Sequence, residues 1–255
     1  MKLIIVAVVL LTASWGSAQT ELEQGIAAYN NRAQGSVEDR AQSEHIEKAI
    51  THFEEALKRP ETEEEVAVYL LRSYYFHGKY GVTDKKGQKS VFQKGKDIGE
   101  AYIEKFPESA AILYWYLANL GSWAEVYGIL AAAREGVADL MKEHSEKIIA
   151  LDPEYQDGGG YFMLGAVHYK SPYIPFILSW PDNDDAVTFL TKASDTADAT
   201  PRQKVYMARA LYKDKQKDRA IRILDEVAGM PPSDNEPVDD WEQIKMARSL
   251  LRKYK

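Results

Sequence analysis

The feature that most constrains this chain is a residue spacing that recurs five times along it. Each copy begins with a small or apolar residue, continues with packing residues four and seven positions on, and is followed by a proline. The copies are Ala49, Phe53, Ala56, Pro60; Gly95, Gly99, Tyr102, Pro107; Met141, Ser145, Ile148, Pro153; Ala186, Leu190, Ala193, Pro201; and Ala220, Leu224, Val227, Pro232. Positions four and seven apart share one face of a helix, and proline cannot continue it. The spacing therefore predicts repeated helices.

These copies resemble the second helix of the tetratricopeptide repeat (TPR), in which a small residue lets two helices cross closely. The first helix of that repeat is clearest at Tyr161, Leu164, Gly165 and His168. We therefore predict an all-α, TPR-like helical solenoid, a class of protein that usually binds rather than catalyses.

The connection inside most repeats is longer than the TPR pattern requires. Twelve positions separate Ala208 from Ala220, as in an ordinary repeat, whereas the equivalent separation in the other four copies is between twenty-one and twenty-four. Insertions of a solenoid emerge on one edge and often form a shared surface or the rim of a cavity. We expect five helix pairs with enlarged connections, followed by a C-terminal capping helix.

The expected layout is one domain over 19–255. Its repeats span 20–58, 62–105, 108–150, 157–198 and 201–229, and the capping helix spans 238–254. Thr62 with Glu65, and Thr200 with Gln203, have the spacing of capping boxes at helix starts. The acidic run that begins at Asp182 is interpreted as a cap of the helix containing Ala186.

The N-terminus has the pattern of a secretory signal peptide over 1–18. Lys2 precedes an apolar run from Leu3 to Leu11, and small residues lead to Ala18. The mature chain would carry no transmembrane segment, and the sequence has no cysteine that could be lipidated. These observations predict an exported, soluble periplasmic protein.

Charge and motif content exclude several functions. Thirty-nine acidic residues against 32 basic ones give a net charge of −7, which disfavours nucleic acid as a partner. The five histidines lack metal-site spacing, and Gly158–Gly160 lacks the context of a phosphate-binding loop. We expect no enzyme activity, no catalytic residue, no cofactor and no metal.

Aromatic residues supply the candidate ligand or partner site. They gather near the ends of first helices and in the apolar, proline-rich insertion Ser171–Pro181: Tyr74, Tyr75, Trp115, Trp123, Tyr127, Tyr169, Tyr173, Phe176 and Trp180. Neighbours on a helix lie about 100° apart, so successive aromatics cannot all face the core. Either they belong mostly to the core, or they line a groove. We predict that Trp115, Trp123, Tyr169, Tyr173 and Trp180 converge near one opening, because the first helices and insertions of consecutive repeats stack side by side.

The block from Tyr114 to Trp180 resembles the T component of tripartite ATP-independent periplasmic (TRAP) transporters. The resemblance rests on YWYLANLG, KIIALDP, GGGYFMLGAVHY and, just after the block, DDAVTFLTKA. It implies a periplasmic TPR protein that partners a substrate-binding protein and has an apolar, ligand-sized cavity. The repeats are also similar to those of eukaryotic regulators of microtubule dynamics, against which the signal peptide argues.

Two functions follow from the resemblance and the repeats. The first is a non-enzymatic adaptor for a periplasmic substrate-binding protein or TRAP-type transporter, with a cavity for a small apolar or organic-acid ligand. The alternative is a periplasmic scaffold for envelope protein assembly that holds peptide segments in its concave groove. A pocket large enough for a ligand would distinguish the two.

Overall fold

The computed structural model describes residues 20–59 and 62–255, and within them it is helical, with isolated bridges in place of strands. The expected signal peptide, 1–18, lies outside these residues. Residues 20–30 are helical. The remaining helices are α2 (Ser43–Ala56), α3 (Glu63–Phe76), π-helix η2 (His77–Gly81), α4 (Lys85–Lys105), α5 (Ala110–Tyr127), α6 (Ile129–Arg134), α7 (Val137–Leu151), α8 (Tyr155–Lys170), α9 (Asn183–Thr196), α10 (Pro201–Lys213), α11 (Lys217–Gly229) and α12 (Pro237–Tyr254). The all-α, TPR-like fold class is confirmed.

Small residues stand where paired helices cross, as the repeat spacing requires. A Cβ on Gly165 would lie 2.7 Å from Cγ of Leu190, and one on Gly99 would lie 2.3 Å from Cδ2 of Tyr116. Ala186 and Ala220, the first residues of the last two copies, are fully buried. Close approach of the backbones, rather than propensity alone, explains why these positions are small.

The enlarged connections take four different forms. Residues 31–42 form a loop, and η2 extends α3 by a π-helical turn. The short helix α6 lies between α5 and α7, and residues 171–182 form a loop closed by an isolated bridge between Ile174 and Leu178. The last repeat has only a three-residue link, 214–216, between α10 and α11.

The predicted helix starts differ in outcome. Thr200 forms a capping box with Gln203, and Asp182 accepts hydrogen bonds from the N–H groups of Asp184 and Asp185, as expected. The capping box at Thr62 is wrong, because its side chain makes no bond to the start of α3. In α8, Gln156 to Gly158 have left-handed backbone angles, so the regular helix starts only at Gly159.

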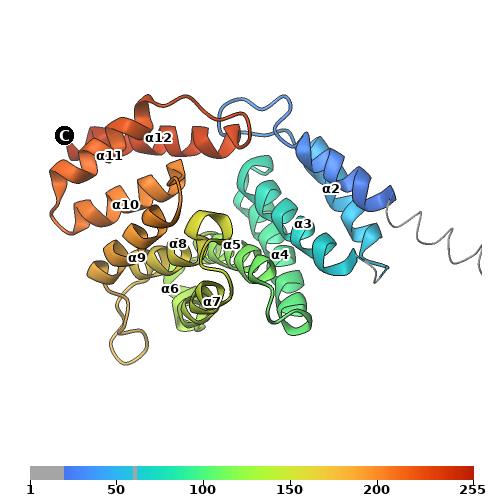
Figure 1. Ribbon diagram of the computed structural model, residues 1–255, viewed down its shortest axis with the longest axis horizontal. Helices are drawn as coiled ribbons and strands as arrows, with labels where there is room; N and C mark the ends of the chain where they lie inside the picture. Colours follow the sequence, from blue (N-terminus) through green and yellow to red (C-terminus); the bar gives the residue numbers. More distant parts are fainter. Residues whose placement is uncertain (1–19, 60–61) are drawn as a thin grey trace, which may run out of the picture.

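The solenoid closes on itself through α12, which does more than cap the last repeat (Figure 1). Ala247 and Leu250 pack in the same core as α10 and α11. Val238, at the other end of α12, is buried with the first repeat. Arg32 donates to Glu236 at 2.7 Å, and Lys245 pairs with Asp39 at 2.6 Å. The two ends of the array are therefore held together.

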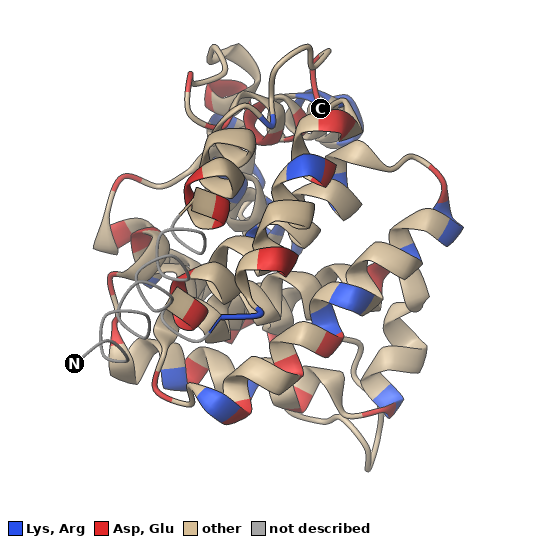
Figure 2. Cartoon of the chain, turned by 90° about the vertical axis from the view of Figure 1, so that its right-hand side faces the viewer, with Lys and Arg blue, Asp and Glu red and all other residues tan. Residues whose placement is uncertain are grey.

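Charged segments of both signs are interspersed over the molecule (Figure 2). In the part of the chain that the structure describes, no helix is both long and apolar enough to span a membrane.

Candidate functional site

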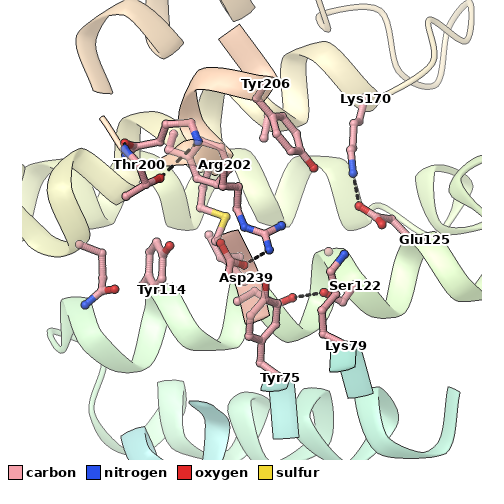
Figure 3. A pocket seen from close by; sticks show the side chains of 18 of the residues that line it. Tyr75, Lys79, Tyr114, Ser122, Glu125, Lys170, Thr200, Arg202, Tyr206 and Asp239 are labelled. Carbon is pink, nitrogen blue, oxygen red and sulfur yellow. Dashed lines mark hydrogen bonds and ion pairs between the residues drawn. The ribbon is translucent and has the colours of Figure 1, made fainter. Parts of the chain in front are cut away.

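The interior of the closed solenoid contains a cavity of about 400 Å³. One end is walled by apolar side chains of α5, α6, α7 and α8, among them Leu117, Val137, Met141, Phe162 and Val167. The other end is polar and is formed by η2, α10 and α12, together with Glu125 of α5 and Lys170 of α8 (Figure 3). A cavity of this size falls within the range of small-molecule sites in proteins, roughly 300–1,000 Å³.

Small side chains leave the space at the apolar end. The α5 stripe that faces the cavity contains Ala118, Gly121 and Ser122, at helical spacing from Tyr114 and Glu125. The facing helices contribute Ala132, Ala133, Ala138 and Ala166. Alanine and glycine at these positions cannot fill the centre, so the helices surround a space rather than a packed core.

Arg202 is the centre of the polar end. It lies in the first turn of α10, where Pro201 and the Thr200 capping box fix the start of the helix. Its Nη2 donates to the Tyr80 hydroxyl at 2.8 Å, to Oε2 of Glu242 at 2.9 Å and to Oδ1 of Asp239. One guanidinium thus joins η2 to α12.

Two lysines complete the polar end. Nζ of Lys79 lies 2.9 Å from Oε1 of Glu242, and Lys170 pairs with Glu125. Lys79 and Tyr80 belong to η2, and π-helical turns are frequent at functional sites. A Cβ on Gly78 would lie 2.6 Å from the Phe92 ring, so a residue without a side chain is required there.

Burial and ion pairing shift the pKa values of these groups. Burial opposes ionisation of Glu242, but Arg202 and Lys79 outweigh it and lower the pKa to about 2. Burial likewise opposes the charge of Arg202, and Asp239 with the surrounding groups raises its pKa well above the ordinary value. Burial raises the pKa of Tyr75 and Tyr114, which keeps both hydroxyls protonated.

Two of the nine predicted aromatic residues, Tyr75 and Trp115, line the cavity. Their ring centroids are 5.8 Å apart, and Nε1 of Trp115 donates to the Tyr155 hydroxyl at 3.2 Å. These side chains from α3 and α5 form an aromatic wall next to Tyr114.

Three other predicted residues lie away from the cavity lining. Tyr74 is buried in the same cluster of apolar side chains as the first repeat, and it donates to Oε1 of Glu54 at 2.5 Å. Trp123 is buried between α4 and α5, where it donates to Oε1 of Gln93 at 2.8 Å and stacks on the half-exposed Tyr127.

The remaining four lie near the 171–182 connection or on α8. Tyr169 packs beside Tyr206, and Trp180 donates to Oδ1 of Asp139 at 2.6 Å. Tyr173 and Phe176 project outward from the connection.

The expected convergence of Trp115, Trp123, Tyr169, Tyr173 and Trp180 at one opening is wrong. Trp115 and Trp123 are eight positions apart on one helix, which places them about 80° apart around its axis. Of the five, only Trp115 lines the cavity.

The polar end was missed by sequence reasoning. Arg202, Lys79, Lys170, Asp239 and Glu125 carry no motif and come from five helices. One available signal was the Thr200 capping box, which places the next residues at a helix start. Another was the run of small residues along α5.

The fold and this interior cavity define the chain as a TPR-like solenoid. In the crystal structure of a thermophilic TPR protein from Thermus thermophilus, a similar fold covers 91% of this chain and 99% of that chain. The TM-score is 0.61 at 16% sequence identity, which supports the fold alone.

The family follows from the sequence comparison. The model described as "Regulator of microtubule dynamics protein 1-3" matches residues 32–177, more than half of the chain. The chain belongs to this family. Regulator of microtubule dynamics protein 3 of Mus musculus is 27% identical over 178 residues, and that of Rattus norvegicus is 26% identical. Each alignment covers 64% of this chain and 37% of the relative, so the chain spans little more than a third of the length of these relatives.

These relatives overturn the functional and cellular predictions. The periplasmic location, the adaptor role beside a TRAP transporter or substrate-binding protein, and the envelope scaffold are wrong, because the matched relatives are mouse and rat proteins. The resemblance to the T component gains no support from them. TPR-like repeats recur in unrelated proteins, so their spacing identified the fold but selected the wrong family. The similarity to regulators of microtubule dynamics, which the signal-peptide interpretation disfavoured, was the informative one.

Proposed function

We propose that this chain is a non-enzymatic binding module that encloses one amphiphilic small molecule. Its apolar chain lies among α5 to α8, and its acidic head lies near Arg202, Lys79 and Lys170. The observation that carries the proposal is a cavity of about 400 Å³ with an apolar end and a polar end, where each of three cations is paired with a carboxylate. This polarity gradient matches the chemistry of a small organic acid with an aliphatic tail.

The preference for an acidic head rests on the geometry of Arg202. A guanidinium has five N–H donors, and the bonds from Arg202 to described residues all leave from Nη2. A carboxylate that enters the cavity can use the other edge of the guanidinium, or it can replace Asp239. A neutral head can accept a hydrogen bond from that edge, but the bond lacks the strength that the charge adds, and a neutral head cannot replace Asp239.

Binding without catalysis fits the ionisation states. A general acid or base works best with a pKa near the working pH. The pKa of Glu242 is lowered, and those of Arg202, Tyr75 and Tyr114 are raised, so all four move away from neutrality. This pattern favours a site that orients a ligand over one that transfers protons.

A titration with saturated fatty acids of increasing length tests the proposal. Calorimetry should give one site per chain, with affinity that increases by about 0.8 kcal/mol per methylene until the apolar end is full. The methyl ester of the best acid is the matched control, and it should bind at least roughly tenfold more weakly because it lacks the charge. Absence of binding by every acid, or equal binding of acid and ester, would reject the proposal.

A second candidate follows from the family. The relatives are named regulators of microtubule dynamics, and the matched residues 32–177 cover most of the repeats. We propose that this part of the chain binds a protein partner in that process. Co-sedimentation with assembled microtubules at low and at moderate salt is the test. A chain that stays in the supernatant at both salt concentrations would exclude direct binding to the polymer.

A further inference from the structure

The connection 171–182, here called the finger, places apolar side chains in water. Phe176 is fully exposed, and Tyr173 and Ile177 are 65% and 58% exposed. The segment 171–181 contains no charged residue. In Figure 1 the finger is the loop between α8 and α9 that stands away from the helices. An apolar tip held in solvent marks a surface that meets something apolar.

The finger is built to hold this tip outward. Backbone hydrogen bonds run from Ile174 N to Leu178 O at 2.7 Å and from Leu178 N to Ile174 O at 2.8 Å. Pro175 and Phe176 occupy the turn between them, and Phe176 has a φ of 65°. A bulky residue rarely adopts this left-handed conformation, where glycine would be unstrained. The chain thus keeps an aromatic residue at a position where the backbone conformation favours glycine.

The base of the finger packs on the wall of the cavity. Leu178 is buried in one cluster with Ala133, Ala138 and Val167. These three small or medium residues also line the cavity. Side chains that pack in one cluster with the base of the finger therefore also form part of the cavity wall.

That wall contains α6, a helix of only six residues between two glycines. Gly128 and Gly136 have positive φ angles, and a Cβ added to either would meet no atom within 4 Å. Ala132 and Ala133 face the cavity, while Leu130 on the same helix is half exposed. A short helix between two permissive joints is the part of the wall that can move with least loss of packing.

We propose that the finger inserts its tip into the surface of a bilayer of zwitterionic lipid, whose net charge is zero, which brings α6 to the membrane as the portal of the cavity. The portal rests on the proposed function, whereas the docking of the finger does not. Even a large aromatic side chain buries only about 150–250 Å² of surface. The three side chains of the tip together therefore bury less than the roughly 800 Å² that each partner buries in a stable protein interface. They suit shallow insertion, with Tyr173 at the level of the head groups.

The charge around the finger selects the lipid. Asp139 bonds to Trp180 at the base, Asp182 is the last residue of the finger, and Asp184 and Asp185 follow it. These four carboxylates outnumber the two nearby cations, which are Lys170 before the finger and Lys142, whose Nζ lies 4.9 Å from the Trp180 ring centroid. The side chain of Asp185 is 56% exposed. These carboxylates would be repelled by the negative surface of a bilayer rich in anionic lipid. Binding should therefore weaken as anionic lipid is added.

Flotation with phosphatidylcholine vesicles tests the docking. The double variant Phe176→Ser with Ile177→Ser should lower vesicle partitioning roughly tenfold or more, since two apolar side chains no longer leave water. The matched control is Val37→Ser with Met246→Ser, which changes two other exposed apolar residues and should partition as the original chain does.

Three outcomes would overturn the proposal: no flotation of the original chain, equal flotation of both double variants, or tighter binding to vesicles containing phosphatidylserine. The proposal would also be overturned if sedimentation velocity showed the original chain as a dimer and the finger variant as a monomer. The finger would then contact a second copy of the chain.

The portal is tested separately by the rate at which an anthroyloxy-labelled fatty acid moves from phosphatidylcholine vesicles into the protein. The finger variant should slow this transfer while leaving the equilibrium affinity for the acid unchanged. If a variant that no longer floats with vesicles still takes up the labelled acid at the original rate, the portal proposal is rejected. Absence of equilibrium binding by the original chain would instead reject the proposed function and leave the docking result standing.

Discussion

The two ends of the cavity are built on opposite principles. The apolar end consists of neighbouring helices in one run of chain, α5 to α8, whose alanines and glycine leave a space. The polar end joins η2, α10 and α12 through ion pairs and the Tyr80 hydroxyl. Local repeat packing thus determines the space, and contacts between distant segments determine the charge beside it. Variants at the two ends should therefore differ in both stability and binding.

The largest expected effect is at Arg202. Arg202→Met leaves the partly buried Asp239 without its cation and Glu242 with Lys79 alone, which should cost about 3–5 kcal/mol of unfolding free energy. Urea denaturation measures it. The exposed Arg252→Met is the control and should stay within about 0.5 kcal/mol of the original chain. A small loss in Arg202→Met would mean that the polar end does not stabilise the closed solenoid.

Acid should weaken the polar end next. The pKa of Glu242 is lowered from its ordinary 4.5 to about 2 in the folded chain. Its stabilising contribution is therefore complete above about pH 5 and is lost as the pH falls towards 2, by about 2–3 kcal/mol. Unfolding free energies of the original chain and of Glu242→Gln should converge over that range. Curves that stay parallel would contradict the lowered pKa.

The same substitution, alanine to leucine, made at two sites should distinguish the open cavity from the packed core. Ala220, fully buried in α11, belongs to the packed core, and Ala220→Leu should cost about 1–3 kcal/mol. Ala166 lines the cavity, so Ala166→Leu should cost less than about 1 kcal/mol because the added atoms enter empty space. It should also lower fatty-acid affinity. Equal losses of stability would show that the apolar end is not open.

The smallest effect is expected at the cap that positions Arg202. Thr200→Ala removes the bond to the N–H of Gln203, which should cost about 1 kcal/mol. Thr62→Ala is a matched control, since Thr62 makes no capping bond, and it should cost less. Thermal melts of both variants compare them directly.

The contrast also explains what the sequence could predict. Helix pairs were predictable because each small residue and its packing partners are separated by a fixed number of positions, as at Ala186, Leu190 and Ala193. Periodicity within one helix reports on neighbours in the chain. Even the enlarged connections were visible as extra residues between such sets.

The polar end follows a different rule. Arg202 and Asp239 are thirty-seven positions apart, and Tyr80 and Asp239 are 159 apart. No spacing encodes these meetings, which depend on the curvature summed over all repeats. Aromatic residues were a poor substitute signal, because Trp123 and Tyr74 serve the core while Tyr75 and Trp115 face the cavity.

Closure by α12 has a consequence for how this architecture can change. An open solenoid gains or loses a repeat with little effect on the others, because each repeat contacts only its neighbours. Here Arg32 must still meet Glu236, 204 positions away. Duplication or deletion of one helix pair would shift that partner by the width of a repeat and separate the ends. The number of repeats is therefore fixed by geometry, and descendants of this chain can vary in their loops far more readily than in their repeat count.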